Sequence, residues 1–188
     1  MREIPKPSKD GRGGWKEVRQ EMKRKMLLIP LALIAMSLIV PVRAGPAWFV
    51  NVQAEITEFK FVGIVPEGIR FDVPFVGVAG GPYVKGTVTG VDHLLIDWDG
   101  IPNLNVYYTI TDKEGDKLSI HVTGKAIAKN PGQSIFEETT VTIISEPGYP
   151  TTGKYSGWVG KEVRGEGFLT DLSMDPPGGY IHIKLYWD

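Results

Sequence analysis

The chain has 188 residues, a formal net charge of −1, 42% hydrophobic residues, 23 Gly, 14 Pro and no Cys. This length suits one domain with a terminal tail. The absence of cysteine excludes a disulfide scaffold, thiolate metal ligands and a cysteine nucleophile, and the near-zero charge gives no overall field to attract nucleic acid.

The net charge hides two unlike parts. Residues 1–44 hold 10 Lys/Arg and 4 Asp/Glu, a balance of +6, which leaves 11 and 18 for residues 45–188, a balance of −7. Residues 1–25 are polar and basic and hold too few apolar residues to bury a core. We therefore expect a basic tail over 1–25, a hydrophobic segment over 26–44 and one domain over 45–188.

The hydrophobic segment fits two interpretations. Residues 26–42 form a run of 17 uncharged residues behind a basic cluster. A cleaved signal peptide would end at a small-residue site, and Val42-Arg43-Ala44 before Gly45 fits one. An uncleaved membrane anchor needs about 17–20 apolar residues. In both cases the basic residues precede the apolar run, so the domain is expected outside the cytoplasm, secreted or anchored to the membrane.

The rest of the chain is typical of an all-β protein. Gly and Pro interrupt it at short intervals, which argues against long helices. Residues 48–56 alternate between apolar and polar, and the alternation resumes with the opposite parity at Phe59, so we expect a β-bulge near Thr57. Short apolar runs follow between Gly63 and Gly81. Further strands are expected over residues 83–91, 93–98, 104–111, 118–123, 136–145, 155–159, 163–170 and 180–187.

The number and spacing of these strands favour an antiparallel sandwich or barrel. A closed barrel removes exposed sheet edges, and it encloses a cavity when it has about eight strands. The sequence therefore predicts an antiparallel β-barrel preceded by a signal or anchor helix.

Residues 81–124 carry a more specific pattern of glycines, aspartates and aromatic residues. This pattern resembles the family catalogued as domain of unknown function 3237, whose members look like calycin and allene-oxide-cyclase barrels. The resemblance implies a barrel with a cavity for a small apolar molecule, and no established activity. The matching positions are Gly81, Pro82, Gly86, Gly90, Asp92, Asp99, Gly100, Tyr108 and Gly115, followed by Tyr155, Trp158, Val163, Gly165 and Gly167.

Polar residues near this pattern are the candidates for ligand binding. Asn105 stands where the family tends to have Asp, and Tyr107 where it tends to have Arg. Asp92 could act with His93, but adjacent strand residues point to opposite faces, which favours reading Asp92 as a turn residue. The face that carries His121 is either solvent or lumen. The predicted ligand-binding residues are Asp92, Asn105, Tyr107, His121 and Trp158.

Catalytic and metal-binding signals are weak. Glu137 and Glu138 are adjacent on a predicted strand, so one of them is expected to face the interior, where an apolar wall would raise its pKa. No two histidines have the spacing of a zinc site. Residues 97–100 lack the spacing of an EF-hand calcium loop and are read as a turn. We therefore predict no metal and no cofactor.

Three functional hypotheses remain open. The first is a barrel that binds a small hydrophobic ligand in its lumen. The second is a cyclase or isomerase on the same barrel, favoured if an ionisable carboxyl lies in an otherwise apolar cavity. The third is a membrane-anchored interaction module in which the lumen is filled by side chains. Nucleic acid is not an expected partner, and the membrane is one only if the hydrophobic segment is retained.

Overall fold

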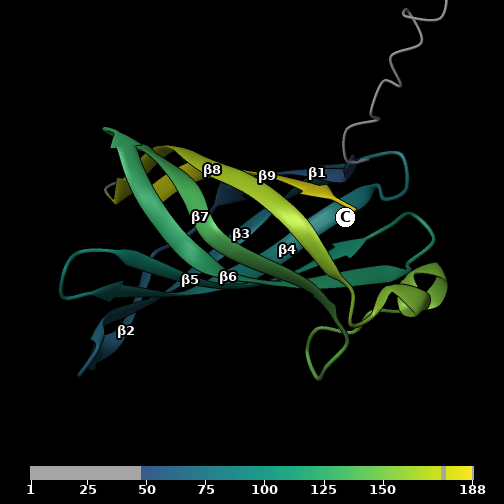
Figure 1. Cartoon of the computed structure of the whole chain (residues 1–188), viewed down its shortest axis with the longest axis horizontal. Coiled ribbons are helices and arrows are strands. Elements are labelled where there is room, and N and C mark those ends of the chain that lie inside the picture. The colour runs from purple at the N-terminus through teal and green to yellow at the C-terminus, as the bar shows by residue number, and fades with distance from the viewer. Residues whose placement is uncertain (1–47, 175–176, 188) are drawn as a thin grey trace, which may run out of the picture. The chain divides into compact units, whose positions relative to one another are not determined.

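The structure, a computed structural model, describes residues 48–174 and 177–187 (Figure 1). The expected tail and hydrophobic segment lie outside the described residues. Within the described ranges, no helix is long and apolar enough to cross a membrane. The elements are β1 (Trp48–Ile56), β2 (Lys60–Val65), β3 (Gly68–Gly80), β4 (Gly86–Asp97), β5 (Pro102–Thr111), β6 (Lys117–Asn130), β7 (Gln133–Ile144), the 3₁₀ helix η1 (Gly153–Trp158), β8 (Glu162–Met174) and β9 (Pro177–Tyr186).

The strands form one antiparallel sheet that closes on itself. Their order is β1-β9-β8-β7-β6-β5-β4-β3-β2, and a further pairing of β1 with β3 closes eight of them into a barrel. β3 is long enough to serve two partners, because residues 75–80 pair with β1 and residues 68–72 pair with β2. β2 pairs with β3 as an edge strand outside the closed ring. The predicted antiparallel barrel is confirmed.

Alternation of side chains defines the inside of the barrel. In β5, Leu104, Val106, Tyr108 and Ile110 are buried, while the residues between them are half-exposed. Successive strand residues point to opposite faces of a sheet, so these four face the lumen. The alternation expected for this strand is therefore confirmed.

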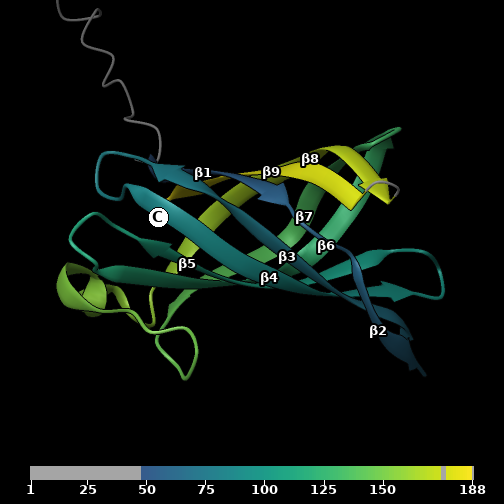
Figure 2. The same cartoon turned by 180° about the vertical axis from the view of Figure 1, so that it is seen from behind.

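The two ends of the barrel differ. The turns that join β2 to β3, β4 to β5 and β6 to β7 lie at one end, together with the end of β8 and the start of β9, and this end is called here the hairpin end (Figures 1 and 2). The opposite end carries η1, the β5–β6 turn and the start of β1. There Phe49 stacks on Trp187 with ring centroids 4.4 Å apart, and Trp158 meets both rings edge-on. We call this the filled end, because aromatic side chains occupy it.

Two predictions about strands in this barrel are wrong. Residues 83–98 were expected as two strands with a turn at Asp92, but β4 runs unbroken from Gly86 to Asp97. Residues 155–159 were expected as a strand, but they overlap η1. Gly153, with φ +56, turns the chain into η1, and Ser156 Oγ donates a hydrogen bond to the Gly153 carbonyl at 2.9 Å.

The predicted bulge near Thr57 is a link between two strands. β1 ends at Ile56 and β2 begins at Lys60. The backbone N–H of Thr57 donates to the Pro74 carbonyl at 3.0 Å, and its hydroxyl donates to the same oxygen at 3.1 Å. The parity of the apolar residues changes here because β1 and β2 pair with different parts of β3.

Candidate functional site

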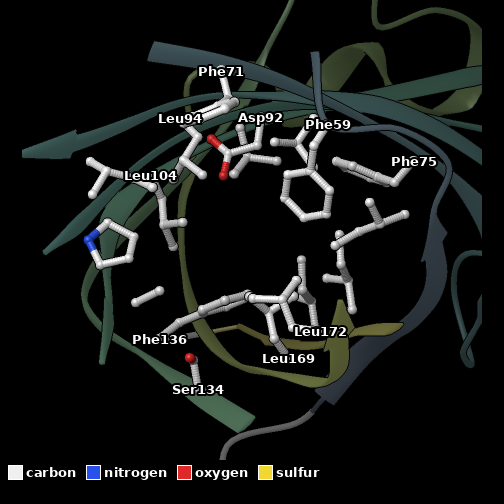
Figure 3. A pocket seen from close by; sticks show the side chains of 18 residues that line it. Phe59, Phe71, Phe75, Asp92, Leu94, Leu104, Ser134, Phe136, Leu169 and Leu172 are labelled. Atoms are coloured by element: carbon white, nitrogen blue, oxygen red, sulfur yellow. The ribbon is translucent and has the colours of Figure 1, made fainter. Parts of the chain in front are cut away.

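The lumen contains an apolar cavity of about 130 Å³ at the hairpin end (Figure 3). Its lining includes Pro102 beside the β4–β5 turn and Ser134 beside the β6–β7 turn, which places it at this end. All lining residues except Asp92 and Ser134 are apolar. They are Ile56, Phe59, Phe71, Val73, Phe75, Leu94, Ile96, Pro102, Leu104, Val106, Ala126, Phe136, Leu169, Leu172, Ile181 and Ile183.

The cavity has a buried floor and a half-open rim. Val73, Phe75 and Val106 are buried at its inner side, whereas Phe59 is half-buried and Leu172 is 37% exposed. Because the rim side chains reach solvent, the hairpin end is the side from which a small molecule can reach the cavity.

Glycines in the wall make room for the large side chains of the lumen. A Cβ at Gly90 would collide with the ring of Phe75 and with Cβ of Tyr108. A Cβ at Gly167 would collide with the ring of Phe136. The absence of side chains at these two positions lets aromatic rings lie against the backbone of the wall.

Asp92 is the ionisable group in this lining. Its residue is 8% exposed, and its carboxyl faces the cavity beside Leu94 and Leu104 (Figure 3). The backbone N–H of Asn105 donates to Asp92 Oδ1 at 2.9 Å. Within the described residues, no hydrogen bond is made to the second carboxyl oxygen.

The position of Asp92 follows from an interruption between β4 and β5. The ladder pairs Asp92 with Val106 and then Leu95 with Asn103, so His93 and Leu94 lie outside it without a shift of register. The Asn105 amide, which faces this gap, bonds to the Asp92 side chain instead of a backbone carbonyl. The carboxyl therefore bonds to the backbone of the barrel wall and also borders the cavity.

Burial controls the protonation of Asp92. Desolvation raises the pKa of its carboxyl to about 7, although the hydrogen bond from Asn105 and the nearby His93 both lower it. Near neutral pH this carboxyl is therefore present in both its protonated and its ionised form. A group of this kind can donate or accept a hydrogen bond, and it can exchange a proton with a bound molecule.

His93 lies on the outer face, opposite in direction to Asp92. Its Nδ1 is 2.7 Å from Asp72 Oδ1 on β3, and both side chains are partly exposed. The interpretation of Asp92 as a turn residue is wrong, because β4 continues through it and directs it inward.

Three of the predicted ligand-binding residues lie together, but outside the barrel. Tyr107 stacks on His121 with ring centroids 4.2 Å apart, and His121 Nε2 lies 2.8 Å from Asn105 Oδ1. Tyr149, from the β7–β8 connection, packs on Tyr107 at 5.0 Å. None of these residues lines the cavity. The rings are in direct contact with one another and hold the β7–β8 connection against β5 and β6.

Trp158, which was also predicted to bind a ligand, belongs to the filled end. Its ring packs against Phe49, Tyr155 and Trp187. It is therefore separated from the cavity along the barrel, and it contributes to the core.

Glu137 and Glu138 both point outward, so the expectation that one of them faces the interior is wrong. Glu138 has φ +52, which breaks the alternation of β7. Glu138 pairs with Lys125 at 2.7 Å and Glu137 pairs with Lys129 at 3.3 Å, all at exposed positions. Glu137 points outward because it follows the cavity-lining Phe136 on the strand, and the β-bulge opposite Gly124 turns Glu138 outward as well.

Sequence reasoning missed the aromatic part of the site. Phe59, Phe71, Phe75 and Phe136 line the cavity. For Phe71, Phe75 and Phe136 the signal in the sequence is alternation along a strand, but alternation alone does not separate a cavity wall from a filled core. In the described ranges no cluster of three or more His, Cys, Asp or Glu side chains is placed to hold a metal ion.

Comparisons with known proteins show the fold. No protein-family model matches the chain, and no curated protein is detectably similar to it. A conserved protein of unknown function from Rhodopseudomonas palustris is similar in structure, with TM-score 0.57, 15% identity, and coverage of 74% of this chain and 95% of that one. A protein of unknown function from Clostridium acetobutylicum has TM-score 0.52 and 15% identity over 74% and 97%.

A third similar structure is described as a beta-barrel like protein, from Acinetobacter baumannii. It has TM-score 0.51 and 13% identity, and the match covers 74% of this chain and 94% of that chain. At these identities the likeness concerns the barrel and carries no information about a ligand or a reaction.

Proposed function

We propose that this barrel binds a small hydrophobic molecule in the cavity at its hairpin end, with Asp92 meeting the polar group of the ligand. The observation that carries the proposal is an apolar cavity with one inward-facing carboxyl. Sites for small molecules are typically apolar cavities with a few placed polar groups.

The size of the cavity limits the ligand. A dry apolar cavity of about 150 Å³ in another protein binds benzene, and the cavity here is about 130 Å³. A ligand of one ring therefore fits inside, and a longer one would extend past the half-exposed rim. Burial of its surface contributes about 25 cal/mol per Å² before the cost of association.

Filling the cavity tests the proposal. Ala126 is buried in the lining, so Ala126→Phe places a ring in the space that the ligand needs. Ala128 is exposed on the same strand and lies outside the lining, which makes Ala128→Phe the matched control. Toluene titrated in NMR spectroscopy should shift lumen resonances of the native chain and of Ala128→Phe but not of Ala126→Phe. Equal shifts in all three proteins would refute the proposal.

A second candidate is an isomerase or cyclase that uses Asp92 to move a proton. The observation that favours it is the pKa of about 7 for Asp92 in an otherwise apolar cavity, since a general acid or base works best near the ambient pH. Cyclohexanone in deuterated buffer is a direct probe. Catalysis predicts faster deuterium uptake beside the carbonyl with the native chain than with Asp92→Asn, and equal rates would dismiss it.

The third hypothesis required a lumen packed with side chains. The cavity at the hairpin end contradicts that requirement. The filled lumen that distinguished the interaction-module hypothesis is therefore not found at the hairpin end.

The domain is proposed to act outside the cytoplasm. This rests on the basic cluster and the apolar run over residues 26–42. Intact-mass measurement of the protein from its own host tests it. A chain that begins at Gly45 would support cleavage, an intact N-terminus in the membrane fraction would support an anchor, and an intact chain in the cytosol would refute both.

A further inference from the structure

We propose that the ligand of the cavity is a small apolar amine, bound as its ammonium ion with an N–H donated to the free carboxyl oxygen of Asp92. This inference rests on the proposed binding function and names the chemical class of the ligand. It stands on three features of the lining, which are an unpaired carboxyl, the absence of a basic side chain, and a group of phenyl rings.

The carboxyl of Asp92 lacks a positive partner. Among the described residues, its one hydrogen bond comes from the neutral amide of Asn105, and none of those that line the cavity is Lys, Arg or His. A buried carboxylate without a counter-charge is strongly disfavoured. A protonated amine that enters the cavity supplies both the counter-charge and the missing hydrogen-bond donor, and hydrogen bonds between charged partners are the stronger kind.

The rings of the lining also suit a cation. Phe59, Phe71, Phe75 and Phe136 contribute to the lining from different sides (Figure 3). The negative face of an aromatic ring attracts a cation, and the attraction grows when the site excludes water. The same rings supply apolar surface for the hydrocarbon part of the ligand.

The net charge of the whole domain also favours a cationic ligand. Residues 45–188 carry a formal net charge of −7, from 11 Lys/Arg and 18 Asp/Glu. An excess of negative charge raises the local concentration of cations near the protein. An apolar acid, by contrast, would meet repulsion from the domain and from Asp92.

A neutral ligand is the competing occupant. If Asp92 keeps its proton, its O–H can donate to a carbonyl or hydroxyl oxygen. The two cases differ in their response to charge, because removal of the charge at Asp92 weakens the binding of an amine and leaves the binding of a neutral molecule nearly unchanged.

Three ligands of the same size separate these cases. Toluene, benzyl alcohol and benzylamine share one ring and differ in their polar group. We would measure their affinities by calorimetry at pH 8 for the native chain, for Asp92→Asn, and for Asp99→Asn, which makes the same change at an exposed aspartate outside the lining. Benzylamine should bind about 10- to 100-fold more tightly than toluene to the native chain, and this preference should vanish in Asp92→Asn and persist in Asp99→Asn.

The outcomes distinguish the two proposals. If toluene binds and benzylamine has no advantage over it or over benzyl alcohol, the amine inference fails and the binding function stands. If none of the three ligands binds the native chain, the binding function itself fails.

The pH dependence of the native chain gives a readout that needs no variant. His93 acts on Asp92 from the outer face, where it is bonded to Asp72 of β3, and within the described residues no other titratable side chain lines the cavity. Below about pH 7 protons compete with the ammonium ion for the carboxylate. Benzylamine affinity should therefore fall about tenfold per pH unit there, while toluene affinity stays level. A flat profile for benzylamine would overturn the inference.

Discussion

Asp92 shows how one residue serves the wall and the interior of a barrel together. One of its oxygens replaces a backbone carbonyl as the acceptor for the Asn105 amide, where the β4–β5 ladder is interrupted. The other oxygen faces the cavity, and in the part of the chain that the structure describes no basic side chain lies there to neutralise it. Folding therefore stabilises the protonated form of this carboxyl relative to the unfolded chain, in which its pKa is near 3.8.

This difference predicts how stability depends on pH. Between about pH 4 and pH 7 the unfolded chain loses the Asp92 proton and the folded chain keeps it, so the free energy of unfolding falls as the pH rises through this window. The loss is at most about 4 kcal/mol and is complete above pH 7. Asp92→Asn keeps the acceptor for Asn105 and should remove this decline.

Urea unfolding of both proteins at pH 4 and pH 8 measures the effect. Asp92→Asn should gain stability relative to the native chain on going from pH 4 to pH 8. The same difference between the two proteins at both pH values would show that Asp92 ionises in the folded state as it does in water.

Gly90 gives a second prediction at this scale. A Cβ at this position would collide with Phe75 and Tyr108, both buried in the lumen. Gly90→Ala should therefore lower the free energy of unfolding by about 1–3 kcal/mol. Gly80→Ala is the control, since nothing lies within 4 Å of a Cβ there. Equal midpoints for the two variants in urea would count against the packing described.

At the scale of elements, η1 is fastened to the β5–β6 turn by Asp112. Lys154 Nζ lies 2.6 Å from Asp112 Oδ2, and the Tyr155 hydroxyl donates to the same oxygen at 3.1 Å. Oδ1 accepts the backbone N–H groups of Glu114 and Asp116, which shape the turn. The hydrogen bond from Lys154, together with the other donors, holds the pKa of Asp112 below its usual range.

The lowered pKa of Asp112 makes stability fall as the pH falls, which is opposite to the effect of Asp92. The stabilisation from the ionised Asp112 is present above the pKa of an unfolded aspartate and is lost as the pH falls through the lower pKa of the folded state. The melting temperature of the native chain should drop between pH 5 and pH 2, and Asp112→Asn, already lower at pH 7, should drop less. Parallel curves would show that the charge of Asp112 does not fasten η1.

Much of the barrel could be predicted from the sequence, because alternation along a strand depends on local residue order. The alternation over 104–111 gave the correct inward face. The turn expected at Asp92 was wrong. Gly and Asp are typical of turns, but here Gly90 leaves room for the side chains of Phe75 and Tyr108, and the side chain of Asp92 faces the interior. Contacts between strands that are distant in the sequence leave no signal in the local order of residues.

The same limit applies to the candidate site. Asn105, Tyr107 and His121 were predicted to bind a ligand, but none of them lines the cavity. Alternation along a strand does not show which face lines the lumen and which is the outer surface. The φ of +52 at Glu138 belongs to a bulge against β6, and the residue composition of β7 does not predict it.

At the scale of the whole barrel, the aromatic cluster and the cavity lie at opposite ends of the axis. At the filled end the rings of Phe49, Trp158 and Trp187 contact one another, and Tyr155 packs on Trp158. The hairpin end is hollow and lined by apolar side chains. Substitutions at the two ends should therefore affect different properties.

Trp158→Ala tests this separation. It should lower the free energy of unfolding by about 3 kcal/mol, because it empties a packed aromatic cluster, and it should leave the affinity for toluene unchanged. Leu172→Ala at the exposed rim should change stability by less than about 1 kcal/mol and alter toluene affinity. If Trp158→Ala abolished toluene binding while still folded, as judged by circular dichroism, the two ends would not be independent.

The hydrogen bond from Asn105 to Asp92 makes one backbone amide a spectroscopic reporter. A charged acceptor deshields an amide proton more strongly than a neutral one, so the ¹H resonance of Asn105 should move as Asp92 gains or loses its proton. An occupant of the cavity that changes the charge on this carboxyl should move the same resonance, and one that only fills space should leave it nearly in place. The chain thus carries an internal, label-free indicator of the ionic state of its own cavity.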